Sequence, residues 1–200
     1  MMPVMDGLEL CKCIKTDEKT SHIPIILLTA RATLESKIEG LETGADDYIT
    51  KPFDIRELTV RIKNLIEQRN HIQQHFKKLA GLKPEEIATS SRDEEFLKKA
   101  LSILEDHITD SDFNVSEFSK AIAISSSHLN RKIKALTGQS TQQFILAFRL
   151  NRAAQLLEND SGTILEIATL VGIESVSYFS RTFRKQFGVS PSQYRNNNSF

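Results

Sequence analysis

Two groups of hydrogen-bonding side chains in the C-terminal half have the chemistry needed to bind the edges of base pairs. Each group contains an arginine, Arg131 in the first and Arg181 in the second, 50 residues apart. Arginine can form two hydrogen bonds with guanine in the major groove of DNA, and asparagine can form two with adenine. On a helical wheel drawn at about 100° per residue, the polar side chains gather on one side. This side comprises Ser127, Asn130, Arg131 and Lys134 in the first group and Ser177, Arg181 and Arg184 in the second.

Apolar stripes lie opposite both polar sides, which predicts two helices that each anchor one face in a core. The stripes are Leu129, Ile133 and Leu136 in the first helix and Phe179, Phe183 and Phe187 in the second. We expect the three phenylalanines to be core residues and not stacking platforms for bases. An alternative is that the polar sides are ordinary solvated surfaces, as on any exposed helix.

A duplication in the sequence favours the DNA-binding interpretation over a merely solvated surface. The offset between the copies is 49 residues before a turn and 50 after it, so the second copy has one extra turn residue. Each copy reads as a short helix, a tight turn and a second, more basic helix, which is the helix-turn-helix layout. The matched residues are Glu117, Phe118, Ser119, Ile122, Gly138, Ser140 and Phe144 in the first copy and Glu166, Ile167, Ala168, Val171, Gly188, Ser190 and Tyr194 in the second.

Helix start signals divide this half of the chain into helices. One helix is expected from Thr141 to Glu158, and at 18 residues it would span roughly 27 Å. Successive major-groove faces on one side of DNA lie ~34 Å apart, so such a helix could hold two reading helices near the required separation. Capping boxes are predicted for the pairs Asn114 and Glu117, Ser140 and Gln143, Thr163 and Glu166, and Ser190 and Gln193, the last with Pro191 at the first helical position.

Composition indicates a globular protein with an uneven charge distribution. The 200 residues are 40% hydrophobic and 26% charged, with a formal net charge of zero. Residues 1–75 carry 10 Lys and Arg against 12 Asp and Glu, whereas residues 96–200 carry 12 against 9. We expect no membrane span, and we expect Cys11 and Cys13 to be free thiols on different faces of a helix, with no metal site.

The N-terminal third alternates between predicted helices and strands, which is typical of an α/β domain. Only two strands are expected, too few for an independent sheet of this class. A capping box of Asp54 and Glu57 is expected to begin the last of these helices. The predicted elements are helix 7–16, strand 24–29, helix 34–42, strand 48–50 and a helix from residue 54 to about Arg69, followed by a polar linker and an amphipathic helix 94–108 with Phe96, Ala100, Ile103 and Leu104 on one face.

Residues 96–200 closely resemble the DNA-binding domain of the AraC/XylS family of transcription regulators. The most specific stretch is Ile164–Arg195, and Ile173 and Gln186 depart from the usual pattern. The resemblance implies base-reading roles for Ser127, Asn130, Arg131, Ser177, Tyr178 and Arg181. It leaves phosphate contacts to His128, Lys132, Lys134, Thr182, Arg184 and Lys185.

The N-terminal third resembles the second half of a response-regulator receiver domain. The segments Met1–Gly7, Gly44–Tyr48 and Lys51–Phe53 carry the likeness. It implies that Thr29 bonds phosphoryl oxygens, Lys51 pairs with their charge and Tyr48 moves on activation, and it makes Lys51–Pro52 a candidate cis peptide. The phosphoaccepting aspartate and acidic Mg²⁺ ligands of the family would precede Met1, so we expect no cofactor in this chain and Mg²⁺ only in a complete receiver.

The expected fold class is mainly α: a truncated α/β, flavodoxin-like receiver fragment and an all-α domain with two helix-turn-helix units joined by a long helix. The expected modules are residues 1–69 (receiver half), 70–95 (linker) and 96–200 (DNA-binding domain). The expected function is a sequence-specific transcription regulator, the output module of a two-component phosphorelay, and not an enzyme. The alternative is an interaction or dimerisation fragment without an independent DNA-binding role.

The expected partners are double-stranded DNA, a second copy of the chain, and histidine kinase modules of a longer parent protein. Kinase activity would lie outside this chain. We expect a cytoplasmic location, with a parent anchored in the inner membrane.

Overall fold

The structure is a computed structural model that describes residues 5–17, 19–30, 42–78, 91–159 and 161–198. It is mainly helical with one small parallel sheet, which confirms the expected fold class. Within the described residues, no helix combines the length and the hydropathy needed to cross a membrane.

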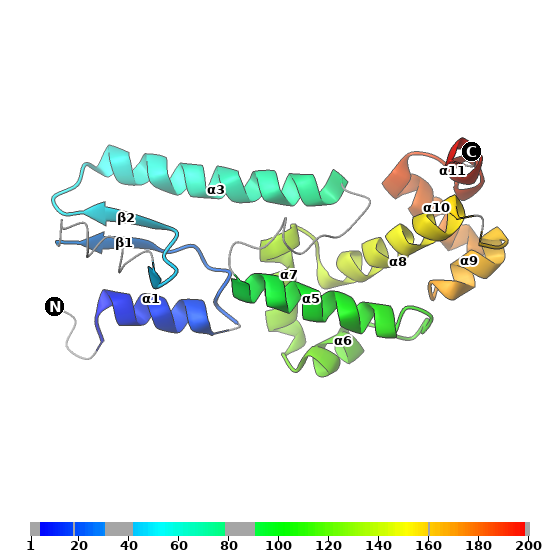
Figure 1. Cartoon of the computed structure of the whole chain (residues 1–200), viewed down its shortest axis with the longest axis horizontal. Coiled ribbons are helices and arrows are strands. Elements are labelled where there is room, and N and C mark those ends of the chain that lie inside the picture. Colours follow the sequence, from blue (N-terminus) through cyan, green and yellow to red (C-terminus); the bar gives the residue numbers. More distant parts are fainter. Residues whose placement is uncertain (1–4, 18, 31–41, 79–90, 160, 199–200) are drawn as a thin grey trace. The chain divides into compact units, whose positions relative to one another are not determined.

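The N-terminal part contains two helices and two strands. They are α1 (Gly7–Thr16), β1 (Ile26–Thr29), β2 (Asp47–Thr50) and α3 (Ile55–Lys78). The strands pair in parallel, with Ile26 opposite Asp47 and Thr29 opposite Thr50. In Figure 1 the two strands run between α1 and α3.

Helix α1 has the predicted bounds, and Asp6 caps it through a reciprocal bond with Glu9. Its two cysteines are free thiols; Cys11 is buried and Cys13 is exposed, as expected for neighbours on different helix faces. Both strands lie within or next to their predicted ranges. The predicted helix 34–42 falls almost entirely outside the described residues.

Helix α3 differs from its prediction at both ends. Asp54 accepts a hydrogen bond from the backbone N–H of Arg56 (2.8 Å), but Glu57 pairs with Arg61 and does not complete the predicted capping box. The helix continues to Lys78, beyond the predicted end at Arg69. Residues 70–78 contain no glycine or proline, so nothing local breaks the helix there.

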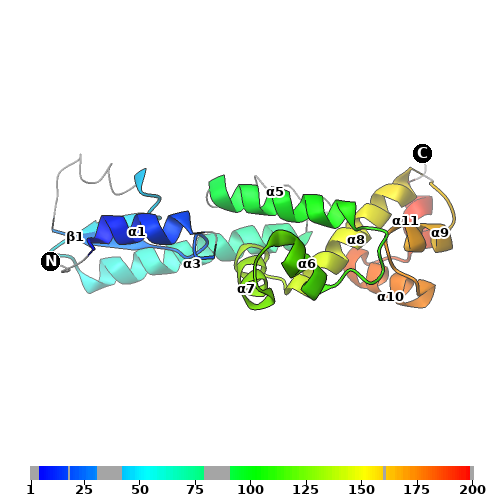
Figure 2. The same ribbon diagram turned by 90° about the horizontal axis from the view of Figure 1, so that it is seen from below.

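The C-terminal part consists of helices, and its elements follow the predicted order. They are α5 (Ser91–Asp106), α6 (Val115–Ile122), α7 (Ser126–Thr137), α8 (Thr141–Glu158), α9 (Ile164–Leu170), α10 (Val176–Phe187) and α11 (Pro191–Asn198). Figures 1 and 2 show α6 and α7 near one end of α8. Helices α9, α10 and α11 lie near the other end of α8. Helix α8 has the predicted bounds, whereas α5 begins three residues before its predicted start and ends two residues before its predicted end.

Most of the predicted caps form. The reciprocal bonds of a capping box are present at α8, α9 and α11. At α6, Asn114 accepts from the N–H groups of Ser116 and Glu117, but the Glu117 carboxylate binds Lys120 at 2.8 Å. The cap of α6 is therefore one-sided, because the glutamate has a charged partner one turn further along its own helix.

The core of the second helix-turn-helix unit packs against α8. Its innermost side chains are 0–2% exposed and come from three helices and the turn: Leu150, Ala153, Leu157, Ile167, Val171, Phe179 and Phe183. The Phe187 and Tyr194 rings lie against Phe183, with centroid distances of 4.4 and 5.4 Å. Phe179 and Phe183 are therefore core residues, as predicted, and Phe187 is partly buried against the same core.

Candidate nucleic-acid interface

Helix α7 has one buried face and one exposed face, as the helical wheel predicts. Leu129 and Ile133 are 0% exposed and Leu136 is 3% exposed. The exposed side chains are Ser127, Asn130, Arg131 and Lys134. The hydrogen-bonding groups of the first polar side therefore point away from the core.

Helix α10 repeats this arrangement. Phe179 and Phe183 are 0% exposed, and Tyr178 is 41% exposed on the other side. The Arg181 guanidinium carbon lies 5.7 Å from the centre of the Tyr178 ring, within cation–π range. The predicted DNA-contacting residues that are exposed here are Ser177, Tyr178, Arg181, Arg184 and Lys185.

One predicted phosphate contact is corrected. Lys132 is only 1% exposed, so its ammonium does not face outward beside Arg131. The physical reason is its wheel position, about 60° from the buried Leu129, where a long side chain is covered together with the apolar stripe. His128 and Thr182 are half-buried. The His128 ring nitrogen lies 2.8 Å from Ser125 Oγ, and the Thr182 hydroxyl donates to the Tyr178 carbonyl of its own helix.

The side chain of Asn130 is exposed but has a partner inside the protein. Its Oδ1 atom accepts hydrogen bonds from the Thr141 backbone N–H (3.0 Å) and from the Thr141 hydroxyl (3.3 Å). Two-bond recognition of adenine requires the same carboxamide oxygen as an acceptor. In this geometry, the Asn130 oxygen already accepts hydrogen bonds from Thr141, the first residue of α8.

The turns of the two units share a left-handed residue. Ala123 has φ +65° and Gly172 has φ +68°. After each of them a backbone N–H returns to the first helix: Ile124 to the Ser119 carbonyl (3.1 Å) and Ile173 to the Ala168 carbonyl (2.9 Å). Such 6→1 bonds close the preceding helix sharply.

The second turn then takes one residue more before its helix begins. In the first unit, Ser125, which caps the start of α7, lies two positions after Ala123. In the second unit, the matching Ser175 lies three positions after Gly172. The predicted extra residue is thus confirmed. Glu174 lies in this longer turn and accepts a hydrogen bond from Ser111 (2.9 Å).

A cation from the helix before each helix-turn-helix unit donates to a carbonyl at or next to the turn, which the sequence did not predict. Arg149 of α8 is 8% exposed and donates to the Gly172 carbonyl (2.7 Å) and to the Asp110 carbonyl. Lys99 of α5 donates to the Ile122 carbonyl (3.3 Å). The two cations are 50 residues apart, one more than the 49-residue offset of the segments before the turns, so extending the repeat toward the N-terminus would not have paired them. Burial lowers the pKa of Arg149 and the charge of Asp110 opposes this, but arginine stays protonated in proteins.

Two further groups fix the ends of the second unit. Hydrogen bonds from the Thr163 backbone and hydroxyl hold the pKa of Glu166 below its usual range. The Tyr194 hydroxyl of α11 donates a hydrogen bond to Glu158 of α8 (2.8 Å). Burial is the larger cause and this hydrogen bond the smaller cause that together raise the pKa of Tyr194 to about 12. Helix α10 lies between these two anchored helices in the chain.

In the N-terminal part, the receiver-like residues gather where the two strands end. Thr29 and Thr50 are paired at the carboxyl ends of β1 and β2, and the Lys51 N–H donates to the Thr29 carbonyl (2.6 Å). The Lys51–Pro52 bond is cis, as expected. The structure therefore brings Thr29 and Lys51 to the same sheet edge, while their phosphoryl-binding roles stay predictions.

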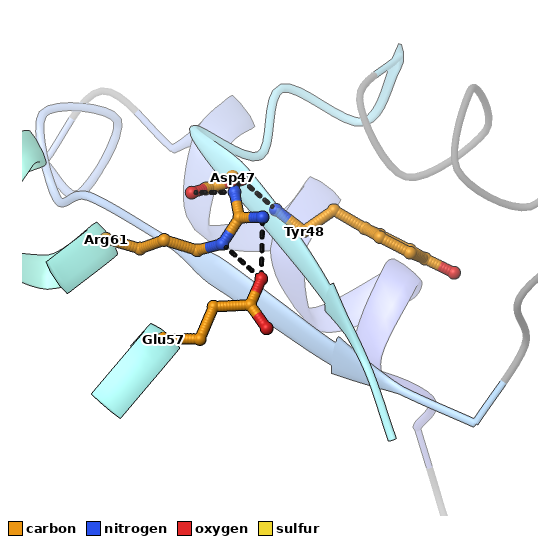
Figure 3. Close-up of polar contacts among 4 residues, drawn as sticks. All are labelled: Asp47, Tyr48, Glu57 and Arg61. Atoms are coloured by element: carbon orange, nitrogen blue, oxygen red, sulfur yellow. Dashed lines mark hydrogen bonds and ion pairs between the residues drawn. The ribbon is translucent and has the colours of Figure 1, made fainter. Parts of the chain in front are cut away.

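Tyr48 is 6% exposed on β2, with its ring directed away from a neighbouring ion cluster (Figure 3). In that cluster Arg61 of α3 binds Asp47 (2.8 Å) and Glu57 (2.8 Å). The hydrogen bond to Glu57, and to a smaller extent the one to Asp47, raises the pKa of Arg61. The role of Tyr48 in a switch is not tested by this geometry and stays a prediction.

The resemblance to receiver domains implies Mg²⁺ at the same sheet edge. Among the described residues, no three His, Cys, Asp or Glu side chains lie close enough together to hold a metal ion. The described residues therefore do not form a Mg²⁺ site by themselves.

The geometry of the C-terminal part defines a class of protein, a DNA-binding module with two helix-turn-helix units on one connecting helix. Residues 118–197 match the helix-turn-helix domain family, and residues 1–63 match the response regulator receiver domain family. The chain therefore carries a receiver segment followed by an AraC-type DNA-binding domain. Both families are regulatory or DNA-binding modules and not catalytic ones.

Two individual proteins are similar to this chain over different lengths. The chain is 48% identical over 196 residues to Histidine kinase P4 of Formosa agariphila. This match covers 98% of this chain and 14% of that protein. It is 53% identical over 68 residues to the phosphate regulon transcriptional regulatory protein PhoB of Pseudomonas aeruginosa, covering 34% of this chain and 30% of that one. The chain thus spans less than a third of either relative.

A solved structure supports the fold of the C-terminal part. A transcriptional regulator from Chromobacterium violaceum, described as containing an AraC-type DNA-binding domain, is 28% identical. The match has a TM-score of 0.50 and covers 55% of this chain and 96% of that chain.

Proposed function

We propose that this chain binds DNA sequence-specifically with two reading helices and serves as the output module of a two-component phosphorelay. The observation that carries the proposal is the outward placement of Arg131 and Arg181 at matched positions of α7 and α10, each opposite a buried apolar stripe. Helix α8, with 18 residues and a length of roughly 27 Å, connects the two units.

We assign the residues of the two faces by their exposure and chemistry. Base reading falls to Ser127 and Arg131 on α7 and to Ser177, Tyr178 and Arg181 on α10, which are all exposed. Phosphate contacts fall to the flanking cations and polar groups: His128, Lys134, Thr182, Arg184 and Lys185. Lys132 is left out because it is buried.

Alanine substitution of the two arginines tests the proposal. Arg131→Ala and Arg181→Ala should each weaken binding to a selected operator by ~1–3 kcal/mol and relax base preference at one position only. The two affected positions should lie in different major-groove segments about one helical turn apart. Selection from random duplex DNA, followed by titration of operators with single-base changes, measures both effects.

Lys134→Ala and Lys185→Ala are the matched controls, because they remove charge from the same two helices. They should weaken binding evenly across sequences and lower the slope of affinity against salt concentration by about one. The proposal is wrong if both arginine variants bind the operator like the parent chain at moderate salt.

The wider context follows from the module order. We propose the division into residues 1–69, 70–95 and 96–200, histidine kinase modules as partners of the receiver segment, and a cytoplasmic location where DNA is accessible. Any kinase activity belongs to a longer parent chain.

Self-association is a second candidate function for the N-terminal part. Large apolar side chains are exposed on α3, including Ile55 (68%), Val60 (56%) and Ile66 (52%). Exposed apolar surface favours association. Light scattering of the chain with and without residues 1–70 separates this function from DNA binding by a monomer.

A further inference from the structure

Among the matched positions at which the duplicated units differ, two pairs have complementary differences. Asn130 of α7 corresponds to Ser180 of α10, and Thr141 at the start of α8 corresponds to Pro191 at the start of α11. In the first unit an amide side chain therefore faces a residue with a backbone N–H. In the second unit a short hydroxyl side chain replaces the amide, and proline, which has no N–H, replaces the threonine.

The hydrogen bonds give a physical account of both differences. The first N–H groups of a helix have no partner within the helix. Ser140 satisfies the N–H of Gln143, which leaves the N–H of Thr141 to Asn130 (3.0 Å). Thr141 is only 1% exposed, so water would not readily replace this acceptor. Pro191 needs no acceptor, and Ser180 supplies none to it.

We propose that Asn130 is a positioning residue that fixes the reading helix α7 against the start of α8, and not a base-reading residue. The bond joins α7 to a different helix, 11 residues further along the chain. Arg131 follows Asn130 directly, so the same bond sets the direction in which Arg131 points. In the second unit, the fixed backbone of Pro191 and the aromatic contacts of α10 hold the reading helix α10 in position instead.

This inference rests on the proposed DNA-binding function and goes beyond it. It predicts that the two reading helices are held in place by different means, although they share a fold. The difference can be tested by copying the second unit into the first.

The experiment compares Asn130→Ser, Thr141→Pro and the double variant Asn130→Ser/Thr141→Pro in the full chain. The backbone accepts proline here, because Ser140 has φ −67° and ψ 159°, which is the extended conformation that precedes proline. Asn130→Ser alone leaves a buried N–H without its acceptor and should weaken binding at the α7 half of the selected operator about tenfold. Thr141→Pro alone should change binding by less than about twofold, because the freed Asn130 oxygen is exposed to water.

The double variant decides between the two roles of Asn130. If Asn130 positions α7, removing the N–H together with its acceptor should restore binding to within about threefold of the parent chain. If Asn130 reads a base, the double variant should stay as weak as Asn130→Ser, with preference lost at one base pair. That second outcome would overturn the inference.

Hydrogen exchange gives a readout that is independent of DNA. The amide of Thr141 should exchange faster in Asn130→Ser, while amides in α10 keep their parent rates. Asn130→Asp supplies a second variant in case the serine variant does not fold, because it keeps the acceptor and loses the amide donor. It should retain the slow exchange of the Thr141 amide and the parent base preference; fast exchange or lost preference contradicts the inference.

Failure of the inference can be told apart from failure of the proposed function. If the parent chain selects no operator, or if Arg131→Ala and Arg181→Ala have no effect, the DNA-binding proposal itself fails. If both arginines matter and the double variant is not restored, only the role of Asn130 is wrong.

Discussion

At the scale of single residues, the two left-handed positions show how one turn geometry tolerates different side chains. Ala123 (φ +65°) is exposed, so its methyl group collides with no other part of the protein. The left-handed backbone conformation alone costs roughly 1 kcal/mol for a residue with a Cβ atom. At Gly172 (φ +68°) a methyl group would also lie 2.5 Å from the Ile108 carbonyl and 3.1 Å from the Arg149 guanidinium carbon. The first turn is therefore strained by its alanine, and the second has no space for one.

Substitutions at these two positions should have opposite effects on stability. Gly172→Ala should lower the free energy of unfolding of the C-terminal part by more than about 1 kcal/mol, because it adds backbone strain and a collision with a carbonyl. Ala123→Gly should raise it by up to about 1 kcal/mol, because it removes the strain. Urea denaturation followed by helix circular dichroism measures both changes, and a loss of stability in both variants would contradict this account of the turns.

At the scale of elements, the repeated unit is larger than a helix-turn-helix. The cations Lys99 and Arg149 lie on α5 and α8, which precede the two units. Lys99 donates to the Ile122 carbonyl at the end of α6, and Arg149 donates to the Gly172 carbonyl in the second turn. The reciprocal caps of α8 and α11 also occupy matched positions, Ser140 with Gln143 and Ser190 with Gln193. Each unit thus includes the helix before it and the start of the helix after it, and α8 serves both units.

Arg149 should be the most costly cation to remove from α8, because it joins this helix to the second turn and to the loop before α6. Arg149→Ala should lower the free energy of unfolding by about 2 kcal/mol or more, since it removes charged hydrogen bonds to carbonyls in a covered site. Arg152→Ala is the control on the same helix. Arg152 pairs with Glu105 at 3.3 Å with both side chains about half exposed, so its loss should cost ~0–1 kcal/mol.

Chemical denaturation of both variants at neutral pH measures this difference. Equal losses in the two variants would show that the bonds of Arg149 do not hold the turn. A normal stability with lost operator binding in Arg149→Ala would instead place its effect on the orientation of α10.

At the scale of the whole molecule, the two parts differ in how much core they contain. The described C-terminal helices bury many large side chains completely, including Phe118, Phe144, Leu157 and Phe183. The described N-terminal part has a two-stranded sheet, and Leu28 on β1 is 40% exposed. Two-stranded sheets are marginally stable in water.

We therefore expect the parts to behave differently when they are separated. A peptide of residues 1–66 should show no cooperative thermal transition, whereas residues 91–200 should unfold cooperatively, because the completely buried large side chains named above all lie in the second fragment. Circular dichroism melting curves and scanning calorimetry of both fragments measure this. A cooperative transition with matching heat from residues 1–66 would contradict the expectation.

The sequence alone was sufficient for features that depend on neighbouring residues. The bounds of α1 and α8, the capping boxes at Ser140 and Thr163, and the buried and exposed faces of α7 and α10 follow from helix periodicity and from bonds within four residues. The duplication further predicted the two units and their extra turn residue. These features have local causes, so a sequence pattern suffices to find them.

Only the tertiary structure decided the features that join distant segments. Asn130 binds Thr141 across two helices, Arg149 binds the Gly172 carbonyl, and Lys132 is buried although its charge suggested a surface position. A side chain with hydrogen-bonding groups suits DNA, solvent or another part of the protein equally well, and its type does not say which. The partner is set by which segments the packed helices bring within about 3 Å of it, and that distance is a property of the fold.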